Sequence, residues 1–178
     1  QHKISEETFT AYRLMHARDA GRVTRPLVTF EAQYRWIQEG RAALFGARAN
    51  GEWHGFIFVL LYKDGAYYMS GCEEPGSDVG VPVGHTLQWH AIQWLKGHSF
   101  CWYEIGWQHF GPQLHYTPAS KEVTISDYKR RFGGQSVPLY TGEKFYSREY
   151  YLQVLEHRIR EFSPQLPQGG EREASPIS

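Results

Sequence analysis

The sequence has little cysteine and no long apolar stretch. Its 178 residues include two cysteines, Cys72 and Cys101, which do not form a CxxC pair. Two cysteines are too few for a disulfide framework, so we expect reduced, buried thiols. No apolar run approaches the roughly 20 residues that span a bilayer. The polar start QHKISEETF predicts no signal peptide. We therefore expect a soluble, cytoplasmic protein.

The sequence also lacks a net charge. Nineteen Lys and Arg balance nineteen Asp and Glu, so nucleic-acid binding would need a local basic patch. A Gly-rich P-loop and a nucleophile elbow are absent too. Nine histidines are present, but His85 and His90 are five residues apart and do not share a helix face. We expect neither a metal site nor a tightly bound cofactor.

Aromatic residues are abundant, at 16% of the sequence. Amphipathic packing accounts for most of them, and some could line a groove. A chain of 178 residues can bury a sizeable core, and we expect one domain over residues 1–162. Residues 163–178 are rich in Pro, Gln, Gly, Glu and Ser, which predicts a disordered tail.

The hydrophobic pattern predicts an α+β fold. Two short helices come first, beginning near Ser5 and Thr29 and ending at Gly21 and Gly40. An antiparallel meander of three strands follows, and then a helix, a strand, a short helix, a hairpin and a last helix. The strands are expected at 43–49, 55–62, 66–71 and 100–107, the longer helices at 85–96 and 148–162, and the hairpin at 137–140 and 144–147.

The stretch KEVTISDYKRRFGG, residues 121–134, is the most unusual part of the chain. Ser126 or Asp127 could cap a short helix, which Gly133 and Gly134 would end in a left-handed conformation. Lys129, Arg130 and Arg131 would then lie in the first turn, beside free backbone donors. This arrangement predicts a seat for a phosphate or carboxylate. The alternative is a solvated basic turn.

The run ISDYKRRFGG resembles the late segment of FemABX-type transferases, whose domains have the fold of the GNAT superfamily of N-acetyltransferases. Its Tyr128-Lys129 pair followed by Phe132-Gly133 is similar to their aromatic–Lys and Phe-Gly motif. WHAIQW and YEIG lie upstream in the same order as in that family. The resemblance covers roughly residues 9–146. It implies an α+β, GNAT-like fold with a mixed, mainly antiparallel sheet flanked by helices, which agrees with the predicted element order.

The resemblance also implies where an acyl donor binds. In this fold the sheet splays between the third and fourth strands, and the N-terminus of the central helix meets the donor's phosphates. The corresponding residues here are Gly84, His85 and Thr86. Acyl-CoA enzymes usually carry a loop of the form Gln/Arg-x-x-Gly-x-Gly/Ala there. This sequence lacks it, and Pro82 removes a donor. That favours aminoacyl-tRNA over acetyl-CoA as donor, unless the segment is an ordinary Gly/Pro loop.

Three residues are candidates for catalysis. Acyl transfer to an amine needs a base, donors to the oxyanion and an acid for the leaving group. By resemblance, Lys129 holds the terminal nucleotide or the carboxylate of the donor. Glu104 is a candidate base, because burial on a core strand would make its carboxylate more basic. A structural pair with an arginine is the alternative for Glu104. Tyr128 is a candidate acid, at a point where many FemABX members have Phe.

Further residues are assigned to the two substrates by resemblance. The donor-binding set is Arg130, Arg131, Gly133 and Gly134, and its two arginines could extend to tRNA phosphates. Arg22 and Arg25 lie on the loop between the first two helices, which overhangs the acceptor side and suits an anionic acceptor. Trp107 and Gln108 could stack on a sugar ring. Solvated arginines and an ordinary core tryptophan are the alternatives.

The resemblance implies transfer of an acyl or aminoacyl group onto an amine of a cell-envelope precursor, such as one for peptidoglycan, or of a sugar. An acyl-CoA-dependent N-acetyltransferase that acts on an amino sugar or another small amine is the first alternative. A non-catalytic domain that binds a glycan or a partner is the second. The motifs match the second domain of FemAB-type proteins, so we expect a homodimer or a missing second GNAT domain to cover a face beside the first two helices.

Overall fold

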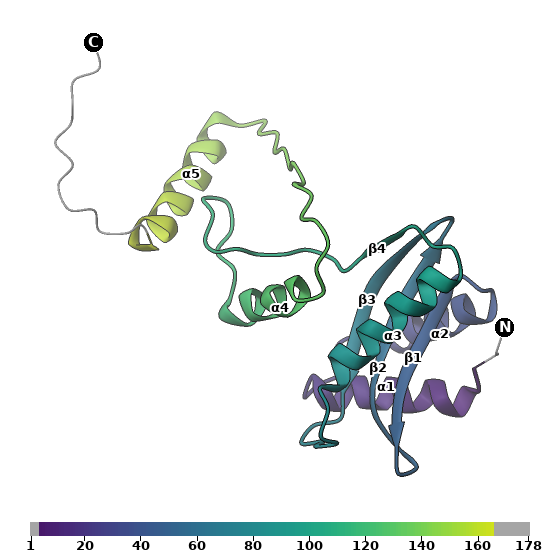
Figure 1. The fold of residues 1–178 in the computed structure, drawn as a ribbon. Helices are drawn as coiled ribbons and strands as arrows, with labels where there is room; N and C mark the ends of the chain where they lie inside the picture. The colour runs from purple at the N-terminus through teal and green to yellow at the C-terminus, as the bar shows by residue number, and fades with distance from the viewer. Residues whose placement is uncertain (1–3, 166–178) are drawn as a thin grey trace. The chain divides into compact units, whose positions relative to one another are not determined.

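The computed structural model describes residues 4–165, and the chain forms two compact units, residues 1–106 and 107–178 (Figure 1). The expected single domain over residues 1–162 stays a prediction. Of the expected tail, residues 163–165 form a short 3₁₀ helix, Ser163–Gln165. The remainder, 166–178, lies outside the described residues. No helix between residues 4 and 165 is long and apolar enough to cross a membrane.

The first unit opens with the two predicted helices. Helix α1 (Glu6–Asp19) begins where expected, because the Ser5 side chain accepts a hydrogen bond from the Thr8 N–H at 3.1 Å. Helix α2 (Leu27–Gln38) begins two residues earlier than predicted, after Pro26. A proline at that point has a fixed φ and lacks a donor that the helix would leave unpaired anyway.

The antiparallel meander is confirmed. Strands β1 (Ala42–Ala49), β2 (Glu52–Tyr62) and β3 (Gly65–Glu73) pair in that order. Asn50 and Gly51 both have positive φ, as the predicted two-residue turn requires. At the centre of β2, Phe56, Ile57, Phe58 and Val59 are all buried. A central strand covered on both faces has this pattern.

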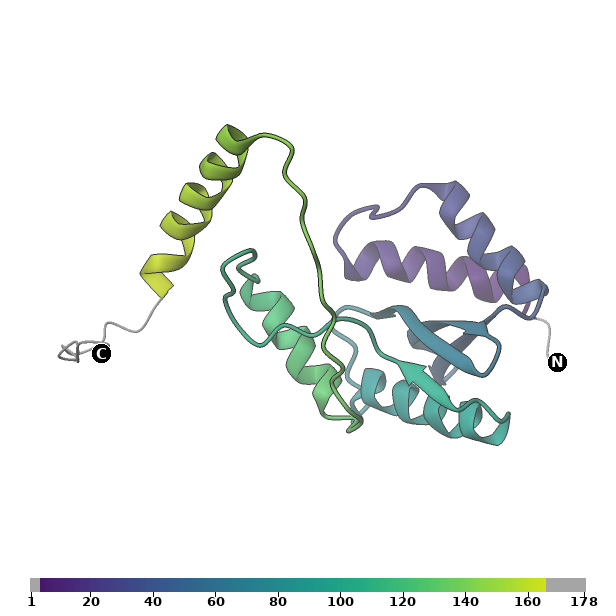
Figure 2. The ribbon, with the colours of Figure 1, turned by 90° about the horizontal axis from the view of Figure 1, so that it is seen from above.

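Helices cover both faces of the sheet. Helix α3 (Val83–Gly97) packs on one face through Leu87, Ala91 and Leu95. Helices α1 and α2 pack on the opposite face, around Tyr12 and Phe30. Figure 2 shows the sheet between these two layers. The core is therefore split into two clusters that share β2, whose side chains alternate between them.

The second unit contains α4 (Ser120–Arg130) and α5 (Arg148–Phe162). The prediction that Ser126 or Asp127 begins α4 is wrong. The helix begins six residues earlier, and the Glu122 carboxylate accepts a hydrogen bond from the Ala119 N–H at 2.8 Å. Ser126 is buried inside the helix and donates to the Glu122 carbonyl.

The hairpin predicted at 137–140 and 144–147 is also wrong, because these residues form no strand. A two-stranded hairpin is marginal without a third strand or a helix to pack on, and Pro138 removes a ladder donor. Helix α5 occupies its predicted range, but none of its residues is buried. The hydrophobic pattern of this helix also predicts that Tyr151 and Ile159 are buried, which is wrong, because both are exposed.

Candidate functional site

The sheet of the first unit opens on one side of β3. Strand β4 (Trp102–Glu104) runs parallel to β3 and pairs only with Gly65, Ala66 and Tyr67. It is shorter than the predicted strand at 100–107, and Gly106 turns the chain with a φ of 81°. Among the described residues, no strand pairs with the rest of this edge of β3. The two strands therefore diverge after Tyr67, which leaves backbone donors and acceptors of β3 for a ligand.

A β-bulge lies within the open stretch. On β2, the consecutive residues Phe58 and Val59 pair with Ser70 and Tyr68 of β3. Met69, which lies between these two β3 residues, has no partner on β2. The bulge changes which face the side chains take. Tyr68 packs with the α3 cluster, whereas Met69 and Cys72 pack with the α1 cluster. Bulges of this kind re-aim side chains and occur often beside active sites.

A buried amide joins β3, β4 and α3 at the divergence. Gln88 of α3 is buried, and its Oε1 accepts a hydrogen bond from the Tyr103 hydroxyl at 2.7 Å. Gln88 also interacts with the Tyr68 side chain and lowers its pKa, but burial outweighs this and raises the pKa of Tyr68 to about 12. Tyr68 therefore keeps its proton at neutral pH. The amide fixes two tyrosines, one on each diverging strand, and so sets the width of the opening.

The N-terminus of α3 lies at the same end of β3. A methyl group on Gly55 would stand 2.6 Å from Val83 Cγ1 and 3.2 Å from the Cys72 carbonyl oxygen, so the missing side chain lets the first turn of α3 approach the sheet. Pro82 is the N-cap and supplies no side-chain acceptor. The structure thus places Gly84, His85 and Thr86 in the first turn of a helix whose end has no cap.

A second polar cluster lies on the α1 face of β3. The hydroxyls of Tyr12 and Ser70 are 2.8 Å apart, and Arg25 Nη1 donates to Ser70 Oγ at 3.2 Å. Tyr12 is fully buried, and burial raises its pKa, so the hydroxyl stays protonated. Of the two arginines predicted for the acceptor side, Arg25 folds back onto the sheet and Arg22 is exposed.

The burial expected for Glu104 is wrong. It is the last residue of β4 and its side chain is exposed, since the strand ends there. Glu104 was a candidate base because burial would make its carboxylate more basic, and an exposed carboxylate lacks that effect. The expectation of two buried thiols is half right. Cys72 is buried, with its pKa raised by burial to about 12, whereas Cys101 is exposed.

The predicted anion seat on α4 is wrong in its geometry. Tyr128, Lys129 and Arg130 lie in the last turn of the helix, not the first. Cations stabilise that end, where carbonyl groups are unpaired. Gly133 and Gly134 do take positive φ after it, as predicted. These residues therefore do not surround free backbone donors.

The cations of α4 have partners inside the second unit. Lys129 Nζ donates to the Trp107 carbonyl at 3.0 Å. Arg130 forms an ion pair with Asp127, and its guanidinium lies 4.6 Å from the Phe110 ring centroid. Arg131 is exposed. The structure thus brings Lys129 and Trp107 together. Glu104 belongs to the first unit and the α4 residues to the second.

The other predicted residues of the second unit differ in exposure. The Trp107 ring is exposed, as stacking on a ligand would require. Gln108 is partly buried, and no donor among residues 4–165 reaches its buried Oε1. Tyr128 contacts Phe132 edge to face, with ring centroids 5.1 Å apart.

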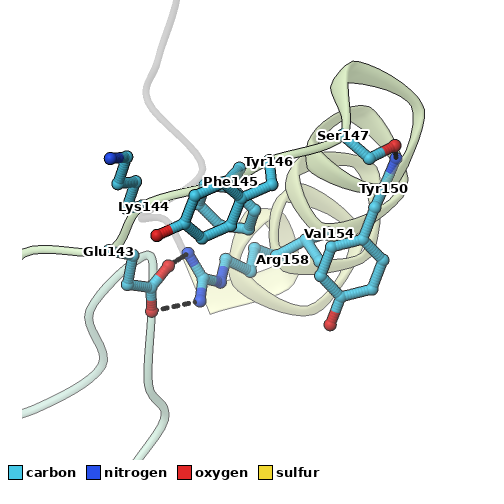
Figure 3. Close-up of a pocket in the computed structure, with 8 residues that line it drawn as sticks. All are labelled: Glu143, Lys144, Phe145, Tyr146, Ser147, Tyr150, Val154 and Arg158. Atoms are coloured by element: carbon cyan, nitrogen blue, oxygen red, sulfur yellow. Dashed lines mark hydrogen bonds and ion pairs between the residues drawn. The ribbon is translucent and has the colours of Figure 1, made fainter.

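A cavity of about 530 Å³ lies between residues 143–147 and α5 (Figure 3). Arg158 donates two hydrogen bonds to the Glu143 carboxylate, at 2.7 and 2.8 Å, and lowers the pKa of that carboxyl. None of the predicted site residues lines this cavity. In the described part of the chain, no three His, Cys, Asp or Glu side chains gather as metal ligands would.

The sequence reasoning missed Tyr12, Ser70, Gln88 and the bulge at Met69. Gln88 could have been found, because it is a polar residue on the stripe that also carries Leu87, Ala91 and Leu95. The link between Tyr12 and Ser70 joins residues 58 positions apart. No local pattern in the sequence indicates it.

The sequence matches no protein-family model and no curated protein. Solved structures do match the fold. The aminoglycoside N-acetyltransferase AAC(6')-Iy in complex with CoA has a TM-score of 0.55 and 15% identity, over 81% of this chain and 92% of that one. The ribosomal-protein-S18-alanine N-acetyltransferase from Escherichia coli has a TM-score of 0.53 and 18% identity, over 74% of both chains.

A third structure, the ribosomal-protein-alanine N-acetyltransferase from Brucella melitensis, has a TM-score of 0.53 and 14% identity, over 79% of this chain and 96% of that one. The predicted α+β, GNAT-like fold is therefore confirmed.

Proposed function

We propose that this chain is an N-acyltransferase of the GNAT superfamily that takes an acetyl or other acyl group from coenzyme A and passes it to a small amine. One observation carries the proposal: the uncapped N-terminus of α3 lies at the end of the sheet where β3 departs from β4. The same fold occurs in a structure with CoA bound. At the sequence level, a CoA-dependent N-acetyltransferase is the first alternative. That alternative is now better supported than transfer from aminoacyl-tRNA.

The donor side suits a phosphorylated thioester. Backbone N–H groups in the first turn of α3, such as those of Val83 and Gly84, would donate to the pyrophosphate, and the helix dipole favours its negative charge. The missing Gly-rich loop and Pro82 reduce the number of donors. The remaining N–H donors in this turn still form an anion site. We therefore expect CoA to bind, but more weakly than it would to a Gly-rich loop.

The reaction needs few groups from the protein. The amine nitrogen attacks the thioester carbonyl carbon, the C–S bond breaks, and the amine proton leaves while the thiolate takes one up. Unpaired backbone donors of the β3 bulge could stabilise the oxyanion. Glu104 as base and Tyr128 as acid stay predictions, as do Trp107 and Gln108 on the acceptor side.

The FemABX-like interpretation, with aminoacyl-tRNA as donor and a cell-envelope precursor as acceptor, rests on the order of the sequence motifs and on the missing Gly-rich loop. The contacts of α4 weaken it, because Arg130 is held by Asp127 and the Trp107 carbonyl takes a hydrogen bond from Lys129. A homodimer, a second GNAT domain and a non-catalytic, glycan-binding role likewise stay predictions.

Isothermal titration with acetyl-CoA tests the proposal directly. We expect saturable binding with a dissociation constant between about 1 µM and 1 mM, the range of ordinary enzyme substrates. S-acetyl-N-acetylcysteamine carries the same thioester without phosphates, and we expect no measurable binding of it. Binding of an aminoacyl-nucleotide analogue together with no heat from acetyl-CoA would reverse the choice of donor.

Lys129→Ala tests the role proposed for the α4 motif. If Lys129 holds a donor phosphate or carboxylate, removing its charge should lower the rate of transfer roughly ten- to a hundredfold. The melting temperature should barely change, because the Lys129 side chain is partly exposed and its hydrogen bond to the Trp107 carbonyl lies at the surface. Lys121→Ala removes an exposed lysine charge in the first turn of the same helix and serves as control. Equal rates in Lys129→Ala and the unchanged chain would contradict the role.

A further inference from the structure

Arg25 carries a positive charge that the described part of the protein does not balance. Its side chain is partly buried, and it reaches from the loop between α1 and α2 to the α1 face of β3. No carboxylate among residues 4–165 forms an ion pair with it. Glu74, at the end of the same strand, is held by Arg18 through two hydrogen bonds of 3.0 and 2.5 Å.

The partners that Arg25 does have are neutral hydroxyls. Nη1 donates to Ser70 Oγ, and the guanidinium also interacts with the Tyr12 hydroxyl. A guanidinium has five N–H donors in a planar fork that matches a carboxylate or phosphate. Two hydroxyls leave most of those donors unused, but they fix the plane in which the fork lies.

The Asp19 carboxylate acts on His16 in the same cluster, but among residues 4–165 it forms no ion pair with Arg25. His16, in the same helix as Tyr12, has its pKa lowered by burial and by the positive charge of Arg25, so it stays neutral at pH 7. Water hydrates the exposed part of this guanidinium when no ligand is bound, and an anion that replaces the water would gain a charge-assisted, bidentate contact. Ser70 follows the bulged Met69 directly, which places this cation beside the open stretch of β3.

We propose that Arg25, oriented by Ser70 and Tyr12, binds a carboxylate or phosphate group carried by the acceptor amine. This inference rests on the proposed acyl transfer. It predicts that the acceptor is an amine that also carries an acidic group, and that it is not a polycation. Arg22, exposed on the same loop, is not part of the anchor, although the sequence suggested both arginines.

Matched pairs of amines test the anchor without any transfer reaction. The carboxylate arm compares 4-aminobutyrate with butylamine, and the phosphate arm compares 2-aminoethyl phosphate with ethanolamine. Binding is followed by NMR on the arginine side-chain Nε–Hε signals of the full chain. We expect the anionic member of at least one pair to bind about ten- to a hundredfold more tightly. The Nε–Hε signal of Arg25 should shift and saturate.

Arg25→Gln should abolish the preference for the anionic amine, whereas Arg22→Gln, the same loss of charge three residues earlier, should keep it. If Arg25→Gln does not fold, the saturating shift of the Arg25 signal in the unchanged chain decides. Equal binding within both pairs, or a preference that survives in Arg25→Gln, overturns the inference. Acetyl transfer to neutral amines alone would overturn the anchor and leave the proposed reaction intact. Preferential binding of the anionic amine without any acetyl transfer would support the anchor and contradict the proposed reaction.

Discussion

Replacing Phe58 with alanine is expected to lower the free energy of unfolding of the first unit by about 3–5 kcal/mol. Phe58 is fully buried at the centre of β2, and its ring stacks on that of Tyr12, with centroids 6.1 Å apart. Truncation removes a large apolar surface and leaves a cavity between α1 and the sheet. Since small domains are stable by about 5–15 kcal/mol, the loss would take much of the total. Urea unfolding followed by tryptophan fluorescence measures it.

Tyr62→Ala is the matched control for this prediction. Tyr62 lies on the same strand, but its side chain is 74% exposed. Its ring contacts Lys63, whose Nζ lies 5.2 Å from the ring centroid, and an exposed contact of this kind adds little. We expect a change within about 0.5 kcal/mol. Similar losses in the two variants would show that β2 is not the centre of the core.

The meander could be predicted from the sequence because its signals are local. Asn50-Gly51 is a turn that needs two positive φ values, and only a few residue pairs tolerate them. The apolar run at Phe56–Val59 excludes an edge strand. Ser5, followed by two acidic residues, specifies the start of α1 through a hydrogen bond to a residue three positions later.

The errors fall where several local signals compete. Ser126 is a good N-cap residue, but Glu122 can close the helix earlier by accepting from the Ala119 N–H. Residues 137–147 alternate like strands, yet a strand forms only where an edge is available to pair with it. Propensity does not show which edge that is, so tertiary structure decides the outcome.

The candidate site was predictable only in part, for the same physical reason. The first turn of α3 could be placed because helix starts have local signals. The bulge at Met69 could not, since it depends on how β2 and β3 pair along their whole length. The contacts of Arg25 with Ser70, 45 positions apart, exist because α1 and the loop after it pack onto β3. The spacing of residues in the sequence therefore cannot show which side chains from different layers of the fold come together in a site.

Replacing Pro82 with aspartate is expected to change helix stability and donor binding in opposite directions. Pro82 occupies the N-cap of α3 with a φ of −71° and a ψ of 99°, in the extended region where capping residues lie. An aspartate there can accept hydrogen bonds from the first-turn N–H groups and stabilise the helix by about 0.5–2 kcal/mol. Loss of the proline's rigidity offsets about 0.4–1 kcal/mol of this gain. The net change lies between about −0.5 and +1.6 kcal/mol, so the melting temperature should change little or rise.

The same aspartate should weaken acetyl-CoA binding roughly ten- to a hundredfold. Its carboxylate occupies the N–H groups that the donor phosphates would use, and it repels their negative charge. Isothermal titration gives the affinity, and thermal unfolding of the same sample gives the stability. A variant that is at least as stable but binds less tightly cannot be explained by damage to the fold.

Pro82→Asn separates the two contributions. An asparagine side chain caps a helix about as well as aspartate does but carries no charge. Its effect on acetyl-CoA should therefore be smaller than that of aspartate, and the difference should shrink as salt is added, because screening weakens the charge repulsion. If Pro82→Asp and Pro82→Asn both bind acetyl-CoA as the unchanged chain does, the first turn of α3 does not hold the donor phosphates. The acyl donor would then have to enter from another edge of the sheet.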